Sequence, residues 1–460
     1  MTDLLLTYYG DDLTGSTDSM EALVLGGVPT VLFLETPSKS QLESYPDVRA
    51  VGLAGISRTM TPAEMDKILP SEFKTLKDFG APLLHYKVCS TFDSSPEIGS
   101  VGRAIDIGMQ VFDHAPVFVA LGAPKLRRYV VFGNHFATAG DVTYRLDRHP
   151  TMKVHPITPM NESDLRLHLS KQTRRAIDLI DVRHLAESQD VIDARICRIE
   201  GHGIDAIILD TLDDSQLLKV GQILWNQGMK KSAFTVGSSG VEFALTAYWQ
   251  TTNIVEPLQA LTPPGSVKQI IAISGSAAPM TALQIERAIE SGFQGIRLNS
   301  VKLIDPTNAK SEQQRAVKET LKGLQDERSV ILYSAFGPDD QVIVKTRKRM
   351  KTLGIPPQRL GHYLGAQQGK ILKDIVLQTG LRRVAIAGGD TAGNVLKQLG
   401  IYVLEFLVPL GTATPLCRAR SHLNEFDGLE IALKGGQLGE LDFFGNVLQG
   451  TQRSGINLSG

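Results

Sequence analysis

A repeated order of apolar strand, polar turn and helix constrains this chain most, and it begins within the first residues. The apolar run Leu4–Leu6 leads into a polar turn, Gly10–Asp18, and then into a helical pattern, Met20–Leu25. Gly26-Gly27 supplies a C-cap, and Val28–Leu34 is the next expected strand. A strand, a helix and a second strand in this order form a βαβ unit. The chain therefore predicts the beginning of a parallel sheet.

The same alternation continues on both sides of a proline-containing segment. Residues 251–267 carry three prolines and no periodic pattern, which is typical of a linker. The expected strands are 50–53, 82–88, 116–121, 176–182, 204–210 and 233–236 before this linker, and 269–273, 330–333, 384–387 and 403–406 after it. Residues 125–160 lack periodicity and are expected to form functional loops. We therefore predict an α/β protein of two domains, 1–250 and 268–460, each a largely parallel sheet flanked by helices.

The length, composition and net charge of the chain restrict the class of protein to which it can belong. Hydrophobic residues at 42% and charged residues at 21% are typical of a globular chain, and 460 residues exceed one ordinary core. A net charge of −1 offers no basic field for nucleic acid or an anionic membrane. The three cysteines are widely spaced and fit no disulfide or metal pattern. No leader and no membrane-spanning run is evident, so we expect a cytoplasmic protein, and a homodimer is compatible with this composition.

Asp11 and Asp12 follow the first strand and precede the first helix. Ligands collect at such strand ends in open α/β sheets, where helix N-termini offer unpaired N–H groups. Two adjacent carboxylates are costly to desolvate unless they bind something or act on a proton. For an isolated pair, the alternative is one N-cap aspartate and one solvated aspartate.

Two later loops of the first domain carry similar chemistry. Arg58 lies between a strand and a helix that opens with the capping box Thr61–Glu64. The loop Lys87–Ser95 combines an ammonium group with several hydroxyls, which suits a polyhydroxylated anion, although a Ser/Thr-rich cap is an equal alternative. His149 and His155 lack a third ligand at useful spacing, which favours hydrogen-bonding histidines over a metal site. The turn Gly237–Gly240 could hold an anion on its amides or permit tight packing.

The second domain offers three candidate phosphate-binding loops. Gly388-Gly389-Asp390-Thr391 follows a strand and begins a helix, so glycine, hydroxyl and helix N-terminus meet there. Its alternative is a glycine turn with an aspartate N-cap. Ser274-Gly275-Ser276 is the second loop, and Lys434-Gly435-Gly436 is the third, where Lys434 could neutralise phosphate charge. Neither a Walker A motif nor a GxGxxG fingerprint occurs.

Together these motifs resemble the four-carbon acid sugar kinases. Gly10–Gly15 with Asp18, Ser57-Arg58, and Tyr86-Lys87 with Ser90-Thr91 are similar to that family's sugar-binding half. The three loops of the second domain are similar to its nucleotide-binding half, and all motifs come in the family's order across nearly the whole chain. The resemblance implies phosphorylation of an acid such as threonate, erythronate or a 3-oxo-tetronate by ATP, with Mg²⁺, at the terminal hydroxyl.

The resemblance also implies roles for single residues. Asp12, with Asp11, would contact the hydroxyls of the acid sugar, and Arg58 would pair with its carboxylate. The remaining substrate contacts would come from Lys87, Cys89, Ser90 and Thr91. ATP would bind at Ser274, Gly275, Ser276, Gly388, Gly389, Asp390, Thr391, Lys434, Gly435 and Gly436. Cys89 stands where the family has an acidic residue, and the arginine that follows in the family is missing, so a branched or oxidised acid such as 3-oxo-isoapionate is an alternative substrate.

Phosphoryl transfer needs positioning, a charge clamp and exclusion of water, which two closing domains can supply. We expect Asp12 to take the proton of the acceptor hydroxyl, with Asp390 as its rival. The sequence does not identify the ligands of Mg²⁺. A ribokinase-like sugar kinase, a non-catalytic acid-sugar-binding protein and a dehydrogenase are the weaker alternatives, and ATP binding would separate a kinase from a sensor.

Overall fold

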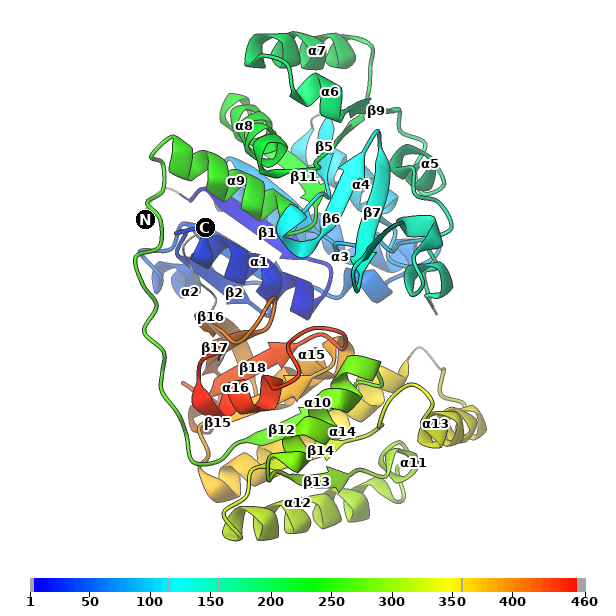
Figure 1. Ribbon diagram of the computed structural model, residues 1–460, viewed down its shortest axis with the longest axis vertical. Helices are drawn as coiled ribbons and strands as arrows, with labels where there is room; N and C mark the ends of the chain where they lie inside the picture. Colours follow the sequence, from blue (N-terminus) through cyan, green and yellow to red (C-terminus); the bar gives the residue numbers. More distant parts are fainter. Residues whose placement is uncertain (1–3, 114–115, 156, 357–358, 453–460) are drawn as a thin grey trace. The chain divides into compact units, whose positions relative to one another are not determined.

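The computed structural model describes residues 4–113, 116–155, 157–356 and 359–452. The chain forms two compact units, residues 1–259 and 260–460. Each unit is a mainly parallel β-sheet with flanking helices (Figure 1), so the predicted α/β class is confirmed. No helix in these described ranges is long and apolar enough to cross a membrane.

The N-terminal unit contains a fully parallel row of strands in the order β2-β3-β1-β4-β11-β5-β10-β9. Most of these strands are buried along their whole length, as expected for parallel strands covered on both faces. Their bounds are β1 Leu6–Gly10, β2 Thr30–Phe33, β3 Ala50–Ala54, β4 Leu83–Lys87, β5 Val117–Ala120, β9 Ile177–Ile180, β10 Ala206–Leu209 and β11 Ala233–Gly237.

The helices of this unit begin where local capping chemistry predicts. Asp12 caps α1, and Thr61 and Glu64 form the predicted capping box of α3 with Pro62 in its first turn. Gly27 follows α1 with a φ of +85°, a conformation that favours glycine. The helices are α1 Leu13–Leu25, α2 Lys39–Glu43, α3 Pro62–Asp78, α4 Val101–Phe112, α5 Leu165–Leu169, α6 Val182–Leu185, α7 Gln189–Gly201, α8 Asp214–Lys230 and α9 Gly240–Thr251.

The predicted irregular region 125–160 is only partly irregular, and this is a correction. Residues 128–145 form a separate antiparallel sheet of β6 Arg128–Val131, β7 Asn134–Ala139 and β8 Val142–Arg145. Its strands have only four to six residues, and the sequences of β6 and β7 lack the regular apolar–polar alternation by which a half-buried strand is recognised. Gly133 and Gly140 take positive φ at its turns. His149 and His155 accept backbone hydrogen bonds there, from Met152 N at 3.3 Å and Thr158 N at 3.1 Å respectively.

The C-terminal unit has the strand order β13-β14-β12-β15-β18-β17-β16. Its first five strands run parallel, and the pairs β18–β17 and β17–β16 are antiparallel. The sequence analysis missed β13, β17 and β18, because their short runs mix charged with apolar residues. Their bounds are β12 Ile271–Ser274, β13 Gln294–Arg297, β14 Val330–Tyr333, β15 Arg383–Ala387, β16 Ile401–Pro409, β17 Pro415–Ser421 and β18 Glu430–Lys434.

The helices of the C-terminal unit pack on this sheet around an apolar core that includes Ile270, Ile331, Ala385 and Phe443. The sequence pattern also predicts helices over 281–290 and roughly 311–325, 341–352, 366–379 and 392–399, and all of them occur. Their bounds, with two short helices that were not predicted, are α10 Pro279–Glu290, α11 Ser300–Leu303, α12 Ala309–Gln325, α13 Gln341–Thr352, α14 Leu360–Thr379, α15 Gly389–Gln398 and α16 Phe443–Gln449.

Strand register brings the predicted loops together at one edge of each sheet. In the N-terminal unit Gly10 lies opposite Ala54 and Lys87, and Gly237 lies opposite Lys87. In the C-terminal unit Ala387 lies opposite Ser274 and Lys434. Because the paired strands are parallel, the loops that follow these residues lie side by side.

Candidate active site

The predicted sugar-binding cluster centres on Arg58. Its guanidinium donates from Nη2 to Asp11 Oδ1 and from Nη1 to Asp12 Oδ2, each at 2.8 Å. Its Nε donates to Asp11 Oδ2 at 3.1 Å. A guanidinium has five N–H donors, and these contacts use three. Two donors are left for a substrate, so the same arginine can neutralise the aspartates and still bind an anion.

Asp12 caps the N-terminus of α1 and at the same time presents an accessible carboxylate. Its Oδ1 accepts a hydrogen bond from Gly15 N at 2.6 Å, which caps α1, and its Oδ2 accepts one from Thr14 Oγ1 at 3.1 Å. The side chain is 23% exposed. The N-cap half of the alternative is therefore confirmed for Asp12, whose carboxylate stays accessible at the end of β1, but the other half is wrong, because Asp11 is buried and not solvated.

Asp11 is the more deeply placed of the two aspartates, with its side chain 8% exposed. Burial raises the pKa of this carboxyl to about 6, and Asp12 adds to the rise while Arg58 opposes it. Asp11 therefore changes charge near neutral pH, within reach of Arg58.

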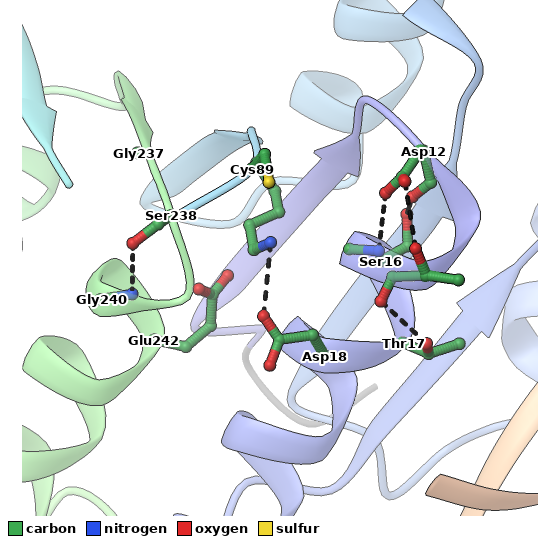
Figure 2. Close-up of polar contacts among 12 residues, drawn as sticks. Asp12, Ser16, Thr17, Asp18, Cys89, Gly237, Ser238, Gly240 and Glu242 are labelled. Carbon is green, nitrogen blue, oxygen red and sulfur yellow. Dashed lines mark hydrogen bonds and ion pairs between the residues drawn. The ribbon is translucent and has the colours of Figure 1, made fainter. Parts of the chain in front are cut away.

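Lys87 lies beneath this cluster at the end of β4. Its side chain is 2% exposed, and its Nζ is 3.5 Å from Asp18 Oδ2. Figure 2 shows Asp18 on α1 and Glu242 on α9 directed toward the same space. The ammonium is thus paired inside the unit, so Lys87 faces its own carboxylates as well as the predicted sugar site.

The loop after β4 holds Cys89, Ser90 and Thr91 in a constrained conformation. Thr91 Oγ1 lies 2.5 Å from Asp93 Oδ1 and 3.1 Å from Cys89 Sγ. Phe92 is buried at a φ of +54°, a strained conformation for a bulky residue. Burial, with the Asp93 carboxylate, raises the pKa of the Cys89 thiol. Position 89 therefore offers a neutral group at neutral pH, and Asp93 supplies the negative charge of the loop.

In the C-terminal unit, the first two predicted nucleotide loops contact each other. A Cβ on Gly275 would lie 1.9 Å from Thr391 Oγ1, so only glycine fits there. Gly388 has a φ of +119° and its N–H donates to Lys434 O at 2.9 Å. Gly389 begins α15 and is half-buried. Asp390 lies in the first turn of α15, and its side chain is outside the described residues.

The third nucleotide loop is held by hydrogen bonds around Thr281. Lys434 Nζ donates to Thr281 Oγ1 at 2.9 Å, and Thr281 Oγ1 lies 2.6 Å from Gly436 O and 3.1 Å from Ser276 Oγ. Lys434 is fully buried and ends β18, so the predicted loop Lys434-Gly435-Gly436 begins with a strand residue. Burial lowers the pKa of Lys434 to about 7. Gly435 completes the loop between Lys434 and Gly436.

Two family models match almost the whole chain. A sugar-binding N-terminal domain matches residues 6–245, and a nucleotide-binding C-terminal domain matches residues 271–444. The chain is also 43% identical over 447 residues to the 3-oxo-isoapionate kinase of Paraburkholderia graminis, which covers 97% of this chain and 94% of that protein. The chain belongs to the four-carbon acid sugar kinase family. The predicted resemblance and the predicted class of enzyme, a sugar-acid kinase, are thereby confirmed.

Other relatives in this kinase family are more distant. The 3-oxo-tetronate kinase of Pseudomonas savastanoi pv. phaseolicola is 26% identical over 446 residues, covering 97% of both chains. A solved structure from Salmonella typhimurium LT2, described as a putative tRNA synthase, has a TM-score of 0.77 at 23% identity and covers 97% of this chain and 99% of its own. Haemophilus influenzae protein HI1011 has a TM-score of 0.68 at 23% identity, covering 96% and 98%. These two structures share the fold.

In this acid sugar kinase, Arg58 contacts Asp11 and Asp12 directly, and Lys87, Cys89, Ser90 and Thr91 lie at the end of the neighbouring strand β4 or in the loop after it. The three predicted nucleotide loops contact one another in the C-terminal unit, while the side chain of Asp390 lies outside the described residues. Three ionisable residues beside the sugar-binding cluster were not predicted as site residues from the sequence. Asp93 was predicted only as part of a loop, His85 only as a strand residue and Glu242 only as a helix residue. The signal for the last two was weak: His85 lies two residues before Lys87, and Glu242 follows the Gly237–Gly240 turn.

Proposed function

We propose that this chain is an ATP-dependent kinase that phosphorylates the terminal hydroxyl of a branched oxo sugar acid, with 3-oxo-isoapionate as the first candidate. The relative at 43% identity carries that name. The supporting feature in this chain is the loop after β4, where Cys89 stands at the position for which the family resemblance implies an acidic residue, and where Thr91 Oγ1 lies 2.5 Å from Asp93 Oδ1. The 3-oxo-tetronates are the next candidates, since more distant relatives are named for them.

The roles of the two domains follow from their edge loops. Residues 1–250 are proposed to bind the acid sugar, 251–267 to link the domains, and 268–460 to bind the nucleotide. Arg58 has two unused N–H donors for the carboxylate of the acid. Asp11, Lys87, Ser90 and Thr91 would contact its hydroxyls directly or hold the residues that do. In the nucleotide domain, the backbone of residues 274–276, 388–391 and 435–436 would hold the phosphates of ATP.

The chemical step requires one proton acceptor. In this proposal Asp12 takes the proton of the terminal hydroxyl as that oxygen bonds to the γ-phosphorus. The bond from the γ-phosphorus to the bridging oxygen of ADP breaks at the same time, and ADP leaves. Asp12 is suited to this role because its accessible carboxylate is already oriented by Gly15 and Arg58. Asp390 remains the rival base.

We expect the phosphates of ATP to supply more of the Mg²⁺ ligands than the protein does. Among the residues that the structure describes, no group of three or more His, Cys, Asp or Glu side chains could hold a metal ion. Mg²⁺ in kinases is typically bound by one or two carboxylates together with substrate phosphates. When bound, the ion neutralises the charge that develops on the phosphoryl group.

The test is ADP release from ATP·Mg²⁺ across a panel of sugar acids. The panel holds D- and L-threonate, D- and L-erythronate, their 3-oxo forms and 3-oxo-isoapionate, with a reaction lacking acid as control. We expect 3-oxo-isoapionate to accelerate release most. Acceleration by another member would keep the kinase and change its substrate. A chain that binds no ATP would contradict the proposal.

A further inference from the structure

A buried group of charges lies behind the proposed acid-sugar site and has no role in the reaction described so far. Glu242 Oε1 lies 2.7 Å from His85 Nδ1, and both side chains are fully buried. His85 Nε2 lies 3.1 Å from Gly237 O. Lys87, two residues after His85 on the same face of β4, is buried and paired with Asp18. Buried ionisable groups are costly, so an arrangement of four calls for an explanation.

The Gly237–Gly240 turn explains how Glu242 reaches this group. A Cβ on Gly237 would lie 2.0 Å from Ala120 O, and a Cβ on Gly240 would lie 2.0 Å from Gly122 O. Only glycine allows α9 to begin so close to the end of β5. Ser238 Oγ already donates to Leu121 O at 2.7 Å and accepts from Gly240 N at 3.0 Å. These contacts favour the packing role of the turn over anion binding, and they bring the first turn of α9 to β4.

Lys87 connects the buried charges to Asp12. Burial disfavours its charged form, but Asp18, Glu242 and Asp11 more than offset this effect and raise the pKa of Lys87. Of these carboxylates, Asp18 on α1 forms an ion pair with Lys87, while Glu242 on α9 and Asp11 after β1 act on it at longer range. Lys87 Nζ also lies 3.2 Å from the position that a Cβ on Gly15 would take. Gly15 is the residue whose N–H orients the Asp12 carboxylate.

We propose that Glu242, held by His85, is a positioning residue of the acid-sugar site, acting through the Lys87 ammonium on the turn that orients Asp12. Asp18 on α1 pairs with this ammonium at 3.5 Å. Glu242 on α9 is directed toward the same space as Asp18 (Figure 2), and its Oε2 has no hydrogen-bond partner among the described residues, so its charge acts on the ammonium without a direct ion pair. Groups that orient the residues of a site commonly change affinity or activity by about 10–100-fold when altered. The inference rests on the proposed function, because Asp12 and Lys87 belong to the proposed sugar site.

The test is Glu242→Gln, which keeps the size of the side chain and removes its charge. With the panel acid that the wild type phosphorylates fastest, we expect kcat/KM for the acid to fall about tenfold. The KM for ATP should stay at its wild-type value. In a Lys87→Met background the same substitution should have little further effect, because Glu242 would have nothing left to position. Glu312→Gln is the matched control: Glu312 is 2% exposed and paired with Arg315, but lies outside both proposed sites.

The outcomes separate this inference from the proposed function. A wild type that phosphorylates no panel acid contradicts the proposed function and, with it, this inference. If the wild type is active and Glu242→Gln is equally active, the inference alone is overturned. It is also overturned if Glu242→Gln lowers kcat/KM by the same factor in the Lys87→Met background as in the wild type. If Glu242→Gln does not fold by circular dichroism, His85→Gln serves instead. His85→Gln should lower kcat/KM for the acid several-fold without changing the KM for ATP. An unchanged kcat/KM would contradict the positioning role of Glu242 and His85.

Discussion

At the scale of single residues, the account depends on Asp12. The carboxylate is the N-cap of α1, the partner of Arg58 and the proposed base at once. Asn at this position keeps the capping group, since Asn and Asp are comparable N-caps, and removes the basicity together with the negative charge that pairs with Arg58. Asp12→Asn therefore separates structure from chemistry better than a truncation to Ala.

We expect Asp12→Asn to lower kcat by about 10²–10⁴-fold, the usual contribution of a general base, with little change in affinity for the acid. Steady-state ADP release and calorimetric binding of the acid measure the two quantities. Asp66→Asn, at an exposed aspartate paired with Arg103, is the control and should retain wild-type turnover. Intact turnover in Asp12→Asn, with turnover lost in Asp390→Asn, would transfer the role to Asp390.

Asp11 should give the pH profile of the enzyme an acidic limb. Burial raises its pKa to about 6, so the carboxylate loses its charge, and its pair with Arg58, as the pH falls through 6. We expect kcat/KM for the acid to rise between pH 5 and 7, and this limb to disappear in Asp11→Asn. The contribution of Asp11 to folding stability depends on pH in the opposite direction. A pKa raised from 3.8 gives a stabilising contribution present below pH 3.8 that is lost as the pH rises through about 6. If the acidic limb of the kcat/KM profile persists in Asp11→Asn, a group other than Asp11 is responsible for it.

Lys434 should make nucleotide affinity depend on pH in the other direction. Burial lowers its pKa to about 7, so its positive charge is lost as the pH rises through 7. If this ammonium attracts the phosphates, ATP should bind more weakly at pH 8 than at pH 6. Calorimetric titration of ATP measures this, and Lys434→Met should show a flatter dependence. Equal pH dependence in both proteins would remove Lys434 from the nucleotide site.

At the scale of elements, two tight turns set the geometry of the proposed sites. Gly275 places its loop against Thr391 in the C-terminal unit, and Gly237 places α9 against β5 in the N-terminal unit. Neither position has room for a side chain. Gly237 therefore lets α9 approach the backbone of β5, whereas Gly275 lets its loop approach the Thr391 side chain.

We expect Gly237→Ala to lower the free energy of unfolding by about 1–3 kcal/mol, as overpacking of a close contact does. Its Cβ would meet the backbone oxygen of Ala120, which cannot rotate away. Gly201→Ala is the control, because Gly201 ends α7 with nothing within 4 Å of an added Cβ, and it should change stability by less than about 0.5 kcal/mol. Denaturant unfolding compares the two, and equal stabilities would show that the contact can relax.

The sequence was informative about elements with strong periodicity and clear caps. The loops after β1, β4, β12 and β15 could be predicted because each joins a buried parallel strand to a helix. The small sheet of β6, β7 and β8 could not, because its strands have only four to six residues and the sequences of β6 and β7 lack a regular apolar–polar alternation. The contacts of Lys87 with α1 and α9 were equally hidden. They depend on where two helices far apart in the chain pack, and no local pattern records that.

At the scale of the whole molecule, the chain divides its chemistry between two units. The N-terminal unit gathers carboxylates, an arginine and hydroxyls at one sheet edge, which suits a polyhydroxylated anion. The C-terminal unit gathers glycines, hydroxyls and helix N-termini, which suits phosphates. The family models divide the chain in the same sense, with a sugar-binding match at 6–245 and a nucleotide-binding match at 271–444.

The most direct test of the central claim is a competition between two acceptors. The full chain is given ATP·Mg²⁺ with equal amounts of 3-oxo-isoapionate and a 3-oxo-tetronate, and the phosphorylated products are counted by mass spectrometry. We predict that phospho-3-oxo-isoapionate will dominate, with the phosphate on its terminal oxygen, and that ADP will form in equal amount. Phosphorylation of neither acid, with ATP left intact, would contradict the account.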